Sequence, residues 1–407
     1  MRTACALGVL VLVAGAARAA TITVGPYVQA ANADGFTVVY ETDQPARGQV
    51  QANGASVADA SASTHHESRI SGLKAATRYP YEVRLDGKSA FAGETRTLPE
   101  HAPFTFVVYG DNRQGGAVEQ ALAERIRAET PDFAVHTGDF VRKGDDEQGW
   151  RESFANERQL LSEIAIFPVF GNHEKWGDPE GDFTRRFFPL LRAQRYYSMR
   201  IAGSAFIVLD GNQPEDATQI AWLEHQLAAA HDAQHVFVFV HQPPFSLGDH
   251  CGSATAQKAW VDLFERFHVR AVFAGHDHAY ERMERNGVRY FVTGGGGAPL
   301  YDERPCGDLD RSAKKLYAEE HHYLRVRVTA DRVEVTAVRA DPVKPPIEAV
   351  ALTAHDSFLP AGPPLVPDDD WPSSLHRRIY RNRQWTYAAG CLLLLVFVGG
   401  RFRRRRA

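Results

Sequence analysis

Hydrophobic and polar residues alternate in short runs along the first part of the chain, over residues 21–98. Such runs occupy 36–40 and 79–83, and glycine, proline, aspartate and asparagine residues separate them. Alternation with a period of two places every second side chain on one face of a strand, and turn-forming residues end each strand. The pattern therefore predicts a small all-β sandwich domain over residues 20–99, followed by a short linker.

The pattern changes after residue 103. Continuous apolar runs that indicate buried strands lie at 104–109, 133–136, 166–170, 236–240 and 270–274. Segments with helical spacing of their apolar residues lie between them, at 115–129, 148–161 and 257–267. Buried strands that alternate with helices are typical of an open α/β sheet. Two alternating runs, 323–329 and 332–338, predict a closing hairpin, and we place this α/β (α+β) domain at 103–340.

Polar motifs follow five of these strands directly. They are Gly-Asp at 110–111, Gly-Asp at 138–139, Gly-Asn-His-Glu at 171–174, Val-His-Gln-Pro-Pro at 240–244 and Gly-His-Asp-His-Ala-Tyr-Glu-Arg at 275–282. In α/β sheets, functional groups gather at the carboxyl ends of the strands. Carboxylate, amide and imidazole groups are ligands for metal ions. The candidate ligands are Asp111, Asp139, Asn172, His241, His276 and His278.

Each motif alone also has a structural interpretation. Asp111 or Asp139 could be a turn residue or a helix cap, Asn172 could form an Asx-turn, and His241 could be a hydrogen-bonded core histidine. His136 is expected to support the site from within its strand, and His65 and His66 are expected on the surface. Five such loops in this order favour a metal site over five separate structural explanations.

These motifs resemble those of the calcineurin-like metallophosphoesterases, and the segment 275–282 is especially similar to the purple acid phosphatase-like branch. The resemblance extends over residues 24–343. It implies a metallophosphoesterase β-sandwich flanked by helices, preceded by a fibronectin type III-like domain. It also implies two divalent or trivalent metal ions, with iron, zinc and manganese as the candidates.

The resemblance assigns roles to individual residues. The first metal ion would be bound by Asp111, Asp139 and His278, and the second by Asp139, Asn172, His241 and His276. A carboxylate such as Asp139 can bridge two ions about 3.5 Å apart. A metal-bridged hydroxide would attack phosphorus, while His173 would donate a proton to the leaving oxygen and Glu174 would orient His173.

Two positions depart from the family pattern. Most members have a histidine at the position of Arg113, and purple acid phosphatases have a tyrosine at that of Arg142. A guanidinium group stays protonated and cannot bind a cation. The first metal ion would then need water, Asn112 or another residue as a further ligand, and the purple iron–phenolate colour should be absent. Arg113 could instead bind a phosphate oxygen, or it could form a salt bridge with a nearby carboxylate.

The first residues indicate export, and export bears on the state of the cysteines. Residues 1–19 contain an apolar stretch and end in Ala17-Arg18-Ala19, which is typical of a cleaved signal peptide. Outside the two apolar termini, the chain has only Cys251 and Cys306. In an oxidising compartment we expect these two to form a disulfide, with two free thiols as the alternative.

The C-terminal part has a different composition from the rest. Residues 341–384 are rich in proline and aspartate and predict an extended linker. Residues 385–400 are apolar or small, and a basic tail follows at 401–407. An aromatic start and an arginine-rich end favour a C-terminal transmembrane anchor, with the enzyme on the periplasmic or extracellular face. A sorting signal removed after export would have a similar sequence.

Composition limits the partners and the size of the core. The 407 residues, 44% of them hydrophobic, suffice for one large core and a small additional domain. The net charge of −4 provides no basic surface for nucleic acid.

The resemblance implies a phosphomonoesterase that acts on a phosphate ester outside the cytoplasm. A phosphodiesterase, or a catalytically impaired binding module stabilised by metal, are the alternatives; substrate, metal identity and oligomeric state stay open.

Overall fold

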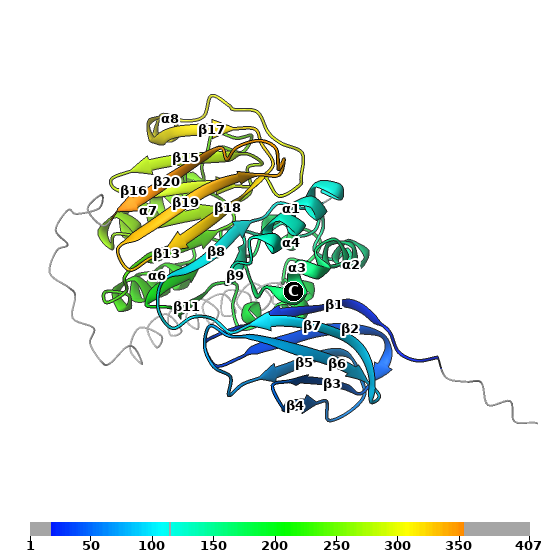
Figure 1. Ribbon diagram of the computed structural model, residues 1–407. Coiled ribbons are helices and arrows are strands. Elements are labelled where there is room, and N and C mark those ends of the chain that lie inside the picture. The colour runs from blue at the N-terminus through cyan, green and yellow to red at the C-terminus, as the bar shows by residue number, and fades with distance from the viewer. Residues whose placement is uncertain (1–17, 114, 354–407) are drawn as a thin grey trace, which may run out of the picture. The chain divides into compact units, whose positions relative to one another are not determined.

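The computed structural model describes residues 18–113 and 115–353. Its N-terminal region consists of two antiparallel sheets (Figure 1). The three-stranded sheet has the order β1 (Ile22–Gln29), β2 (Phe36–Ala46), β5 (Ser63–Ile70). The four-stranded sheet has the order β4 (Ala55–Ala58), β3 (Gly48–Ala52), β6 (Arg78–Leu85), β7 (Lys88–Arg96). The predicted small all-β region is confirmed.

The larger region is built on two mixed sheets. The six-stranded sheet has the order β10 (Ile166–Pro168), β9 (Phe133–His136), β8 (Phe104–Tyr109), β18 (His322–Val328), β19 (Arg332–Arg339), β20 (Glu348–Thr353). The seven-stranded sheet has the order β11 (Tyr197–Ile201), β12 (Ser204–Val208), β13 (Val236–Val240), β14 (Ala271–Ala274), β16 (Val288–Thr293), β15 (Tyr280–Arg285), β17 (Lys314–Ala318). The sequence pattern suggested one open sheet, which is wrong, whereas the β-sandwich flanked by helices is confirmed.

Phenylalanine side chains fill the space between these two sheets. Phe106 of β8 contacts Phe206 of β12 and Phe237 of β13, with ring centroids 5.4 and 5.5 Å apart. Phe106 also lies 6.1 Å from Phe273 of β14. Burying each phenylalanine side chain contributes roughly 1.5–3 kcal/mol to folding. The packing of these rings therefore fixes the two sheets face to face.

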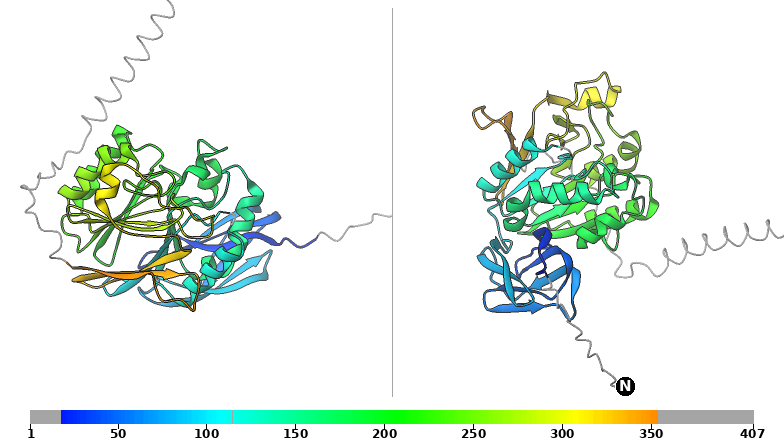
Figure 2. Two further views of the ribbon diagram at one scale, coloured as in Figure 1. Left: turned by 90° about the horizontal axis from the view of Figure 1, so that it is seen from above. Right: turned by 90° about the vertical axis from the view of Figure 1, so that its right-hand side faces the viewer.

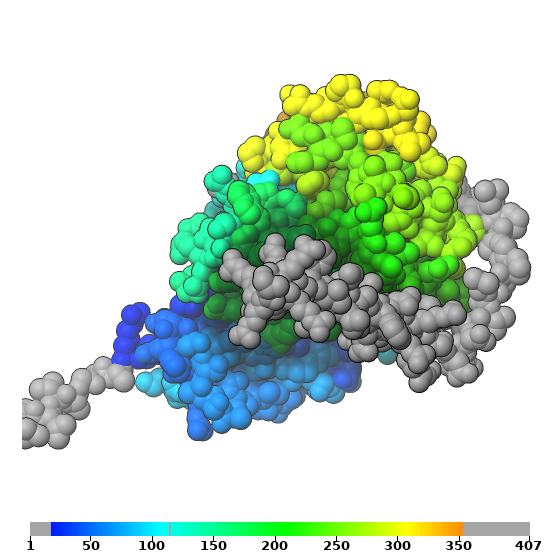
Figure 3. All heavy atoms as spheres, turned by 180° about the vertical axis from the view of Figure 1, so that it is seen from behind, coloured from blue at the N-terminus to red at the C-terminus, as the bar shows by residue number. Residues whose placement is uncertain are grey.

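The sequence of β13, Val-Phe-Val-Phe-Val, shows why its apolar run is continuous. Its phenylalanines belong to the core between the sheets, and its valines belong to a second core that includes Leu223 and Trp260. Leu223 lies on α6 (Ala217–Ala229) and Trp260 on α7 (Ala254–Arg266). A strand buried on both faces has no polar side to alternate with. Figure 2 shows α6 and α7 on the face of the seven-stranded sheet that is turned away from the six-stranded sheet. Their green and yellow-green surface is visible from behind in Figure 3.

The other helices follow strands of the six-stranded sheet, except for α8, which lies between β16 and β17 of the seven-stranded sheet. They are α1 (Ala117–Ala128), α2 (Glu147–Asn156), α3 (Arg158–Glu163), α4 (Asn172–Lys175), α5 (Asp182–Phe187), the 3-10 helix η1 (Pro189–Leu191) and α8 (Asp308–Ala313). A single helix was expected over 148–161, but the structure has two. They meet at Glu157, whose buried carboxylate accepts a hydrogen bond from Tyr109 at 2.8 Å.

Residues 341–353 do not form the beginning of an extended linker. Strand β20 pairs antiparallel with β19, with Val350 opposite Val335 and Leu352 opposite Val333. Leu352 is completely buried. The prediction was wrong because the proline-rich composition around this short alternating run obscured it. The remainder of the linker, 354–384, lies outside the described residues, as do 1–17 of the signal peptide, the anchor at 385–400 and the tail.

The N-terminal sheets contact the larger region through side chains that bind main-chain carbonyls. The Tyr27 hydroxyl donates to the carbonyl of Phe187 at 2.8 Å, and Tyr81 donates to that of Ser162 at 2.9 Å. His66, expected on the surface, is buried instead, where it stacks on Tyr40.

In the part of the chain that the structure describes, we find no helix long and apolar enough to cross a membrane.

Candidate metal centre

The six candidate ligands lie just beyond the carboxyl ends of strands in both sheets, five of them in loops and Asn172 at the start of α4. In the six-stranded sheet, β8, β9 and β10 precede Asp111, Asp139 and Asn172. In the seven-stranded sheet, β13 precedes His241 and β14 precedes the loop that contains His276 and His278. Because the phenylalanine core holds the sheets face to face, these loops meet at one edge of the sandwich. The site is therefore shared between the two sheets.

Three of the six candidate ligands have a left-handed backbone conformation. The φ angles are 59° for Asp111, 60° for Asp139 and 73° for His276. Residues other than glycine rarely adopt this region, and such strain is concentrated at functional sites. At Asp111 and His276 the turned backbone also forms a contact, because the amide of His276 donates to the Asp111 carboxylate at 3.0 Å. The strained turns thus bring the two loops together.

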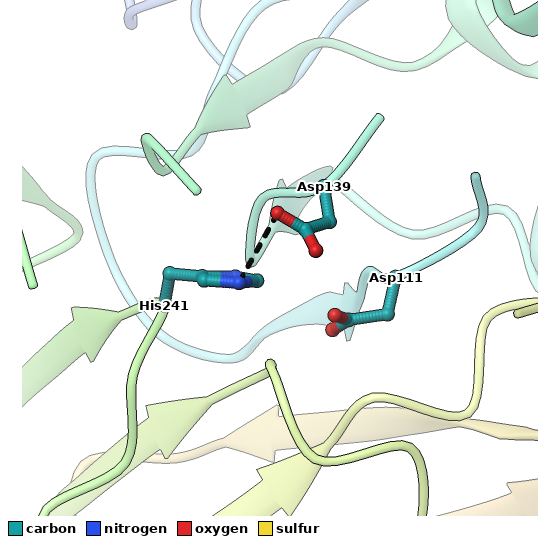
Figure 4. Close-up of side chains that lie close together, drawn as sticks. All are labelled: Asp111, Asp139 and His241. Atoms are coloured by element: carbon teal, nitrogen blue, oxygen red, sulfur yellow. Dashed lines mark ion pairs between the residues drawn. The ribbon is translucent and has the colours of Figure 1, made fainter. Parts of the chain in front are cut away.

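Asp111, Asp139 and His241 form the densest part of the site (Figure 4). One ligand atom from each lies within 4.8 Å of the others, and all three side chains are buried. The Nε2 atom of His241 lies 3.2 Å from Oδ1 of Asp139 and 2.9 Å from Oδ1 of Asn172. Its Nδ1 atom donates to the carbonyl of Thr137 at 2.8 Å. This second contact orients the ring so that Nε2 faces the other candidate ligands.

The two histidines of the loop after β14 complete the cluster. Nε2 of His278 lies 3.6 Å from Oδ1 of Asp111, and Nδ1 donates to the carbonyl of Pro299 at 2.7 Å. The ring of His276 lies edge-on to that of His241, with centroids 5.1 Å apart. The structure therefore gathers all six candidate ligands, three of them oxygen donors and three of them imidazoles.

The electrostatics of this cluster fit a bound cation. Burial raises the pKa of Asp111 to about 8, so two adjacent carboxylates cannot both stay ionised there unaided. Burial lowers the pKa of His276 to about 3 and that of His278 to about 4, which keeps both imidazoles neutral and able to bind metal. The carboxylates, the amide and these two neutral imidazoles are donors that suit iron, zinc or manganese. Although burial opposes it, the adjacent carboxylates raise the pKa of His241 to about 10, so this imidazole must lose a proton to bind metal.

Arg113 lies within this cluster. Its Nε atom is 3.2 Å from Oδ2 of Asp139, and one of its terminal nitrogens is 3.4 Å from Nε2 of His278. Of the two roles considered for Arg113, the salt bridge with a carboxylate is the one present. The guanidinium group thus contacts two of the three candidate ligands of the first ion.

Asn112 is already fully engaged. Its Nδ2 atom donates to Glu119 and Glu157, each at 2.8 Å, and its Oδ1 atom lies 2.9 Å from Nε2 of His136. The suggestion that Asn112 could bind the first ion gains no support, because its amide oxygen faces His136 and its amide nitrogen faces two carboxylates. His136 lies where it was expected, as a support within β9.

His173 lies beside the cluster, with 15% of its side chain exposed. Its Nδ1 atom donates to the carbonyl of Arg142 at 2.5 Å, and Nε2 lies 3.8 Å from Oδ2 of Asp139. Glu174 was expected to orient His173, but its carboxylate instead accepts the amides of Asp139, Phe140 and Gly171 at 2.8–2.9 Å. Glu174 therefore shapes the loop of Asp139, and a main-chain carbonyl orients His173.

Two neighbours of the site were missed in the sequence. His250, with 44% of its side chain exposed, is bound to Asp277 at 2.9 Å, and its ring centroid lies 4.1 Å from that of His276. Tyr301 stacks on His278 with ring centroids 4.1 Å apart. Asp277, between the two histidines of the 275–282 motif, was a signal that a hydrogen-bonding partner for its carboxylate must exist. That partner, His250, could not be named because its loop carries no recognised motif.

A disulfide between Cys251 and Cys306 holds these outer loops. It joins the loop that follows His241 to the loop that follows the glycine run at 294–297. Since His250 directly precedes Cys251, and Tyr301 is in the other loop, the bond constrains both residues beside the histidine ligands. The alternative of two free thiols does not describe this structure.

Comparison with known proteins identifies the larger region. The calcineurin-like phosphoesterase profile matches residues 104–280, and a domain of unknown function, DUF7800, matches 19–103. Tartrate-resistant acid phosphatase type 5 of Sus scrofa is 30% identical over 297 residues, covering 61% of this chain and 82% of that protein. The chain therefore belongs to the calcineurin-like metallophosphoesterases, whose purple acid phosphatase-like members use a binuclear metal centre.

Purple acid phosphatases are among its homologues and its structural neighbours. Purple acid phosphatase 21 of Arabidopsis thaliana is 26% identical over 264 residues, covering 60% of this chain but only 56% of the plant protein. A purple acid phosphatase from yellow lupin (Lupinus luteus) seeds has the same fold, with a TM-score of 0.71 at 14% identity. It covers 82% of this chain, and this chain covers 75% of it. The chain thus spans little more than half the length of the plant protein, and the lupin structure shows the shared fold.

Proposed function

We propose that the chain hydrolyses phosphate monoesters at a centre of two metal ions. Asp111, Asp139 and His278 would hold the first ion. The second ion would be held by Asp139, Asn172, His241 and His276. The observation that carries this proposal is the convergence of six oxygen and nitrogen donors around Asp139, within 4.8 Å for the inner three. When bound, the ions would activate water and neutralise charge on the phosphoryl oxygens.

His173 is the proton donor to the leaving oxygen in this proposal. Its Nδ1–H is bound to the carbonyl of Arg142, so Nε2 is the atom that can carry a proton toward a substrate. Nε2 lies 3.8 Å from the Asp139 carboxylate, at the border between the cluster and the solvent. A leaving alkoxide needs a proton donor at that border, because the alcohol must depart toward water.

Arg113 is the candidate for holding a phosphoryl oxygen. It now forms an ion pair with Asp139, and 13% of its side chain is exposed. A guanidinium group has five donors, so one edge can stay on Asp139 while another receives a phosphoryl oxygen. In this role Arg113 contributes positive charge that does not depend on metal occupancy.

We also propose that the enzyme works outside the cytoplasm. The predicted signal peptide at 1–19 and the disulfide between Cys251 and Cys306 support this location, because disulfides persist in oxidising compartments. Anchoring through 385–400 belongs to the same proposal. Purified membranes and the surrounding medium, probed with an antibody against the 104–353 region, would show where the chain resides; recovery only in the cytoplasm would contradict it.

The test of the catalytic proposal is a comparison of wild type with His173→Ala. Wild type should hydrolyse p-nitrophenyl phosphate with a higher kcat/KM than bis(p-nitrophenyl) phosphate. With glycerol 2-phosphate, whose alkoxide leaving group needs a proton, His173→Ala should lower kcat by about 10²–10⁴-fold, the usual contribution of a positioned acid, with bound metal unchanged. His231→Ala, at an exposed histidine after α6, is the matched control. Faster hydrolysis of the diester would favour a phosphodiesterase, and no turnover with both ions bound would favour an impaired binding module.

A further inference from the structure

One aromatic side chain beside the candidate metal centre is left in solvent. Trp176 is 55% exposed, and it is the only aromatic among the strongly exposed large apolar side chains of residues 18–113 and 115–353. Its ring is edge-on to that of His173, with centroids 5.7 Å apart. A tryptophan side chain can bury 150–250 Å² of surface, so leaving it in water forgoes much stabilisation. Its exposure next to the candidate proton donor therefore calls for an explanation.

The main chain of Trp176 is held firmly in place. Its amide donates to the carbonyl of Asn172 at 3.0 Å, and its carbonyl accepts from the amide of Gly144 at 2.7 Å. The loop that contains Gly144 also provides the Arg142 carbonyl that orients His173. One pair of adjacent segments thus positions both the proton donor and the indole ring.

The surroundings of Trp176 are polar and mostly cationic. Arg142 and Lys143 are exposed on the neighbouring loop, and Lys175 precedes the tryptophan directly. Lys143 is paired with Asp145 at 3.1 Å, whereas the structure shows no side-chain partner for Arg142 among the described residues. A flat apolar ring bordered by cations suits a planar group better than a flexible aliphatic chain.

We propose that Trp176 is a stacking platform for the leaving group, so that the site prefers phosphate monoesters of aromatic alcohols. This inference rests on the proposed hydrolysis, because it assumes that the alcohol leaves on the His173 side of the centre. A ring stacked on Trp176 places its ester oxygen near His173. Trp176 is then a specificity-determining residue, and the preference is for a planar leaving group rather than for the phosphoryl group.

The kinetic test compares two substrates in three proteins. Trp176→Ala should lower kcat/KM for phenyl phosphate by about five- to tenfold, the upper part of the range for loss of one aromatic pair, and change that for glycerol 2-phosphate less than about twofold. Trp176→Phe should retain most of the preference. Leu309→Ala, at an exposed apolar residue of α8, is the control and should change neither value. An equal fall for both substrates would mean that Trp176 only supports His173, and would overturn the proposal.

A binding measurement separates this inference from the proposed hydrolysis. Calorimetry with the metal-loaded full chain would compare phenylphosphonate with methylphosphonate, neither of which is hydrolysed. Wild type should bind phenylphosphonate about five- to tenfold more tightly, and Trp176→Ala should remove the difference. If no ester is turned over but this difference exists and depends on Trp176, the proposed hydrolysis fails while the platform stands. Equal binding of both ligands by wild type would overturn the platform.

Discussion

The two halves of the candidate metal centre differ in what surrounds their shared carboxylate. On one side of Asp139, an amide oxygen and two imidazoles complete a set of four donors. On the other side, Asp111 and His278 are joined by Arg113, which contacts both His278 and Asp139. The half that would hold the first ion thus has three donors and the permanent positive charge of Arg113. The half that would hold the second ion has four donors and no such arginine contact.

Arg113 can weaken one metal site while leaving the ligand residues in place. The guanidinium group cannot bind a cation, and it repels one that approaches the same carboxylate. It also forms an ion pair with Asp139 when the first ion is absent, so less free energy is gained when that ion binds. We therefore expect the two ions to be held unequally, with the first one weaker.

The largest effect should come from the residue that the halves share. Asp139→Ala removes a carboxylate from both ion sites at once, so both ions should be lost and kcat/KM should fall at least about a thousandfold. Metal analysis and hydrolysis of p-nitrophenyl phosphate measure this. The control is Asp331→Ala, in the exposed turn between β18 and β19. Retention of one ion per chain in Asp139→Ala would show that the two halves are independent.

A smaller effect should come from exchanging the residue that separates the halves. Arg113→His replaces a repelling cation with an imidazole, as most family members have, and should tighten binding of the first ion on the order of tenfold or more. Arg113→Lys keeps the charge and should leave the first ion weak. Calorimetric titration of both variants with Mn²⁺ checks this. If the histidine variant binds its first ion no more tightly than wild type, Arg113 is not what weakens the first ion site.

The fold was predictable to the extent that local pattern controls it. Strands β8 and β9 match the predicted 104–109 and 133–136 residue for residue, and the limits of the β18–β19 hairpin differ from the predicted ones by about one residue. The assignment of strands to two sheets was not predictable from periodicity. It depends on which phenylalanines meet across the sandwich, and those contacts join residues such as Phe106 and Phe237 that are distant in sequence.

Within the candidate site, the motif residues could be named from sequence, but their partners could not. Glu174 binds main-chain amides of another loop, and Asn112 is engaged by Glu119 and Glu157. Neither contact has a sequence signature, because each depends on how separate loops pack. Trp176 and His250 were missed for the same reason: each matters only through its distance from a histidine of the site.

Unequal binding of the two ions can be measured by calorimetric titration of metal-free wild type with Mn²⁺, followed by metal analysis after gel filtration. We expect two ions per chain whose dissociation constants differ by about tenfold or more, with the tighter one retained on the column. In His278→Ala, the weaker binding event should disappear and the tighter one should persist. Two ions of equal affinity in wild type, or loss of the tighter ion in His278→Ala, would contradict the unequal halves.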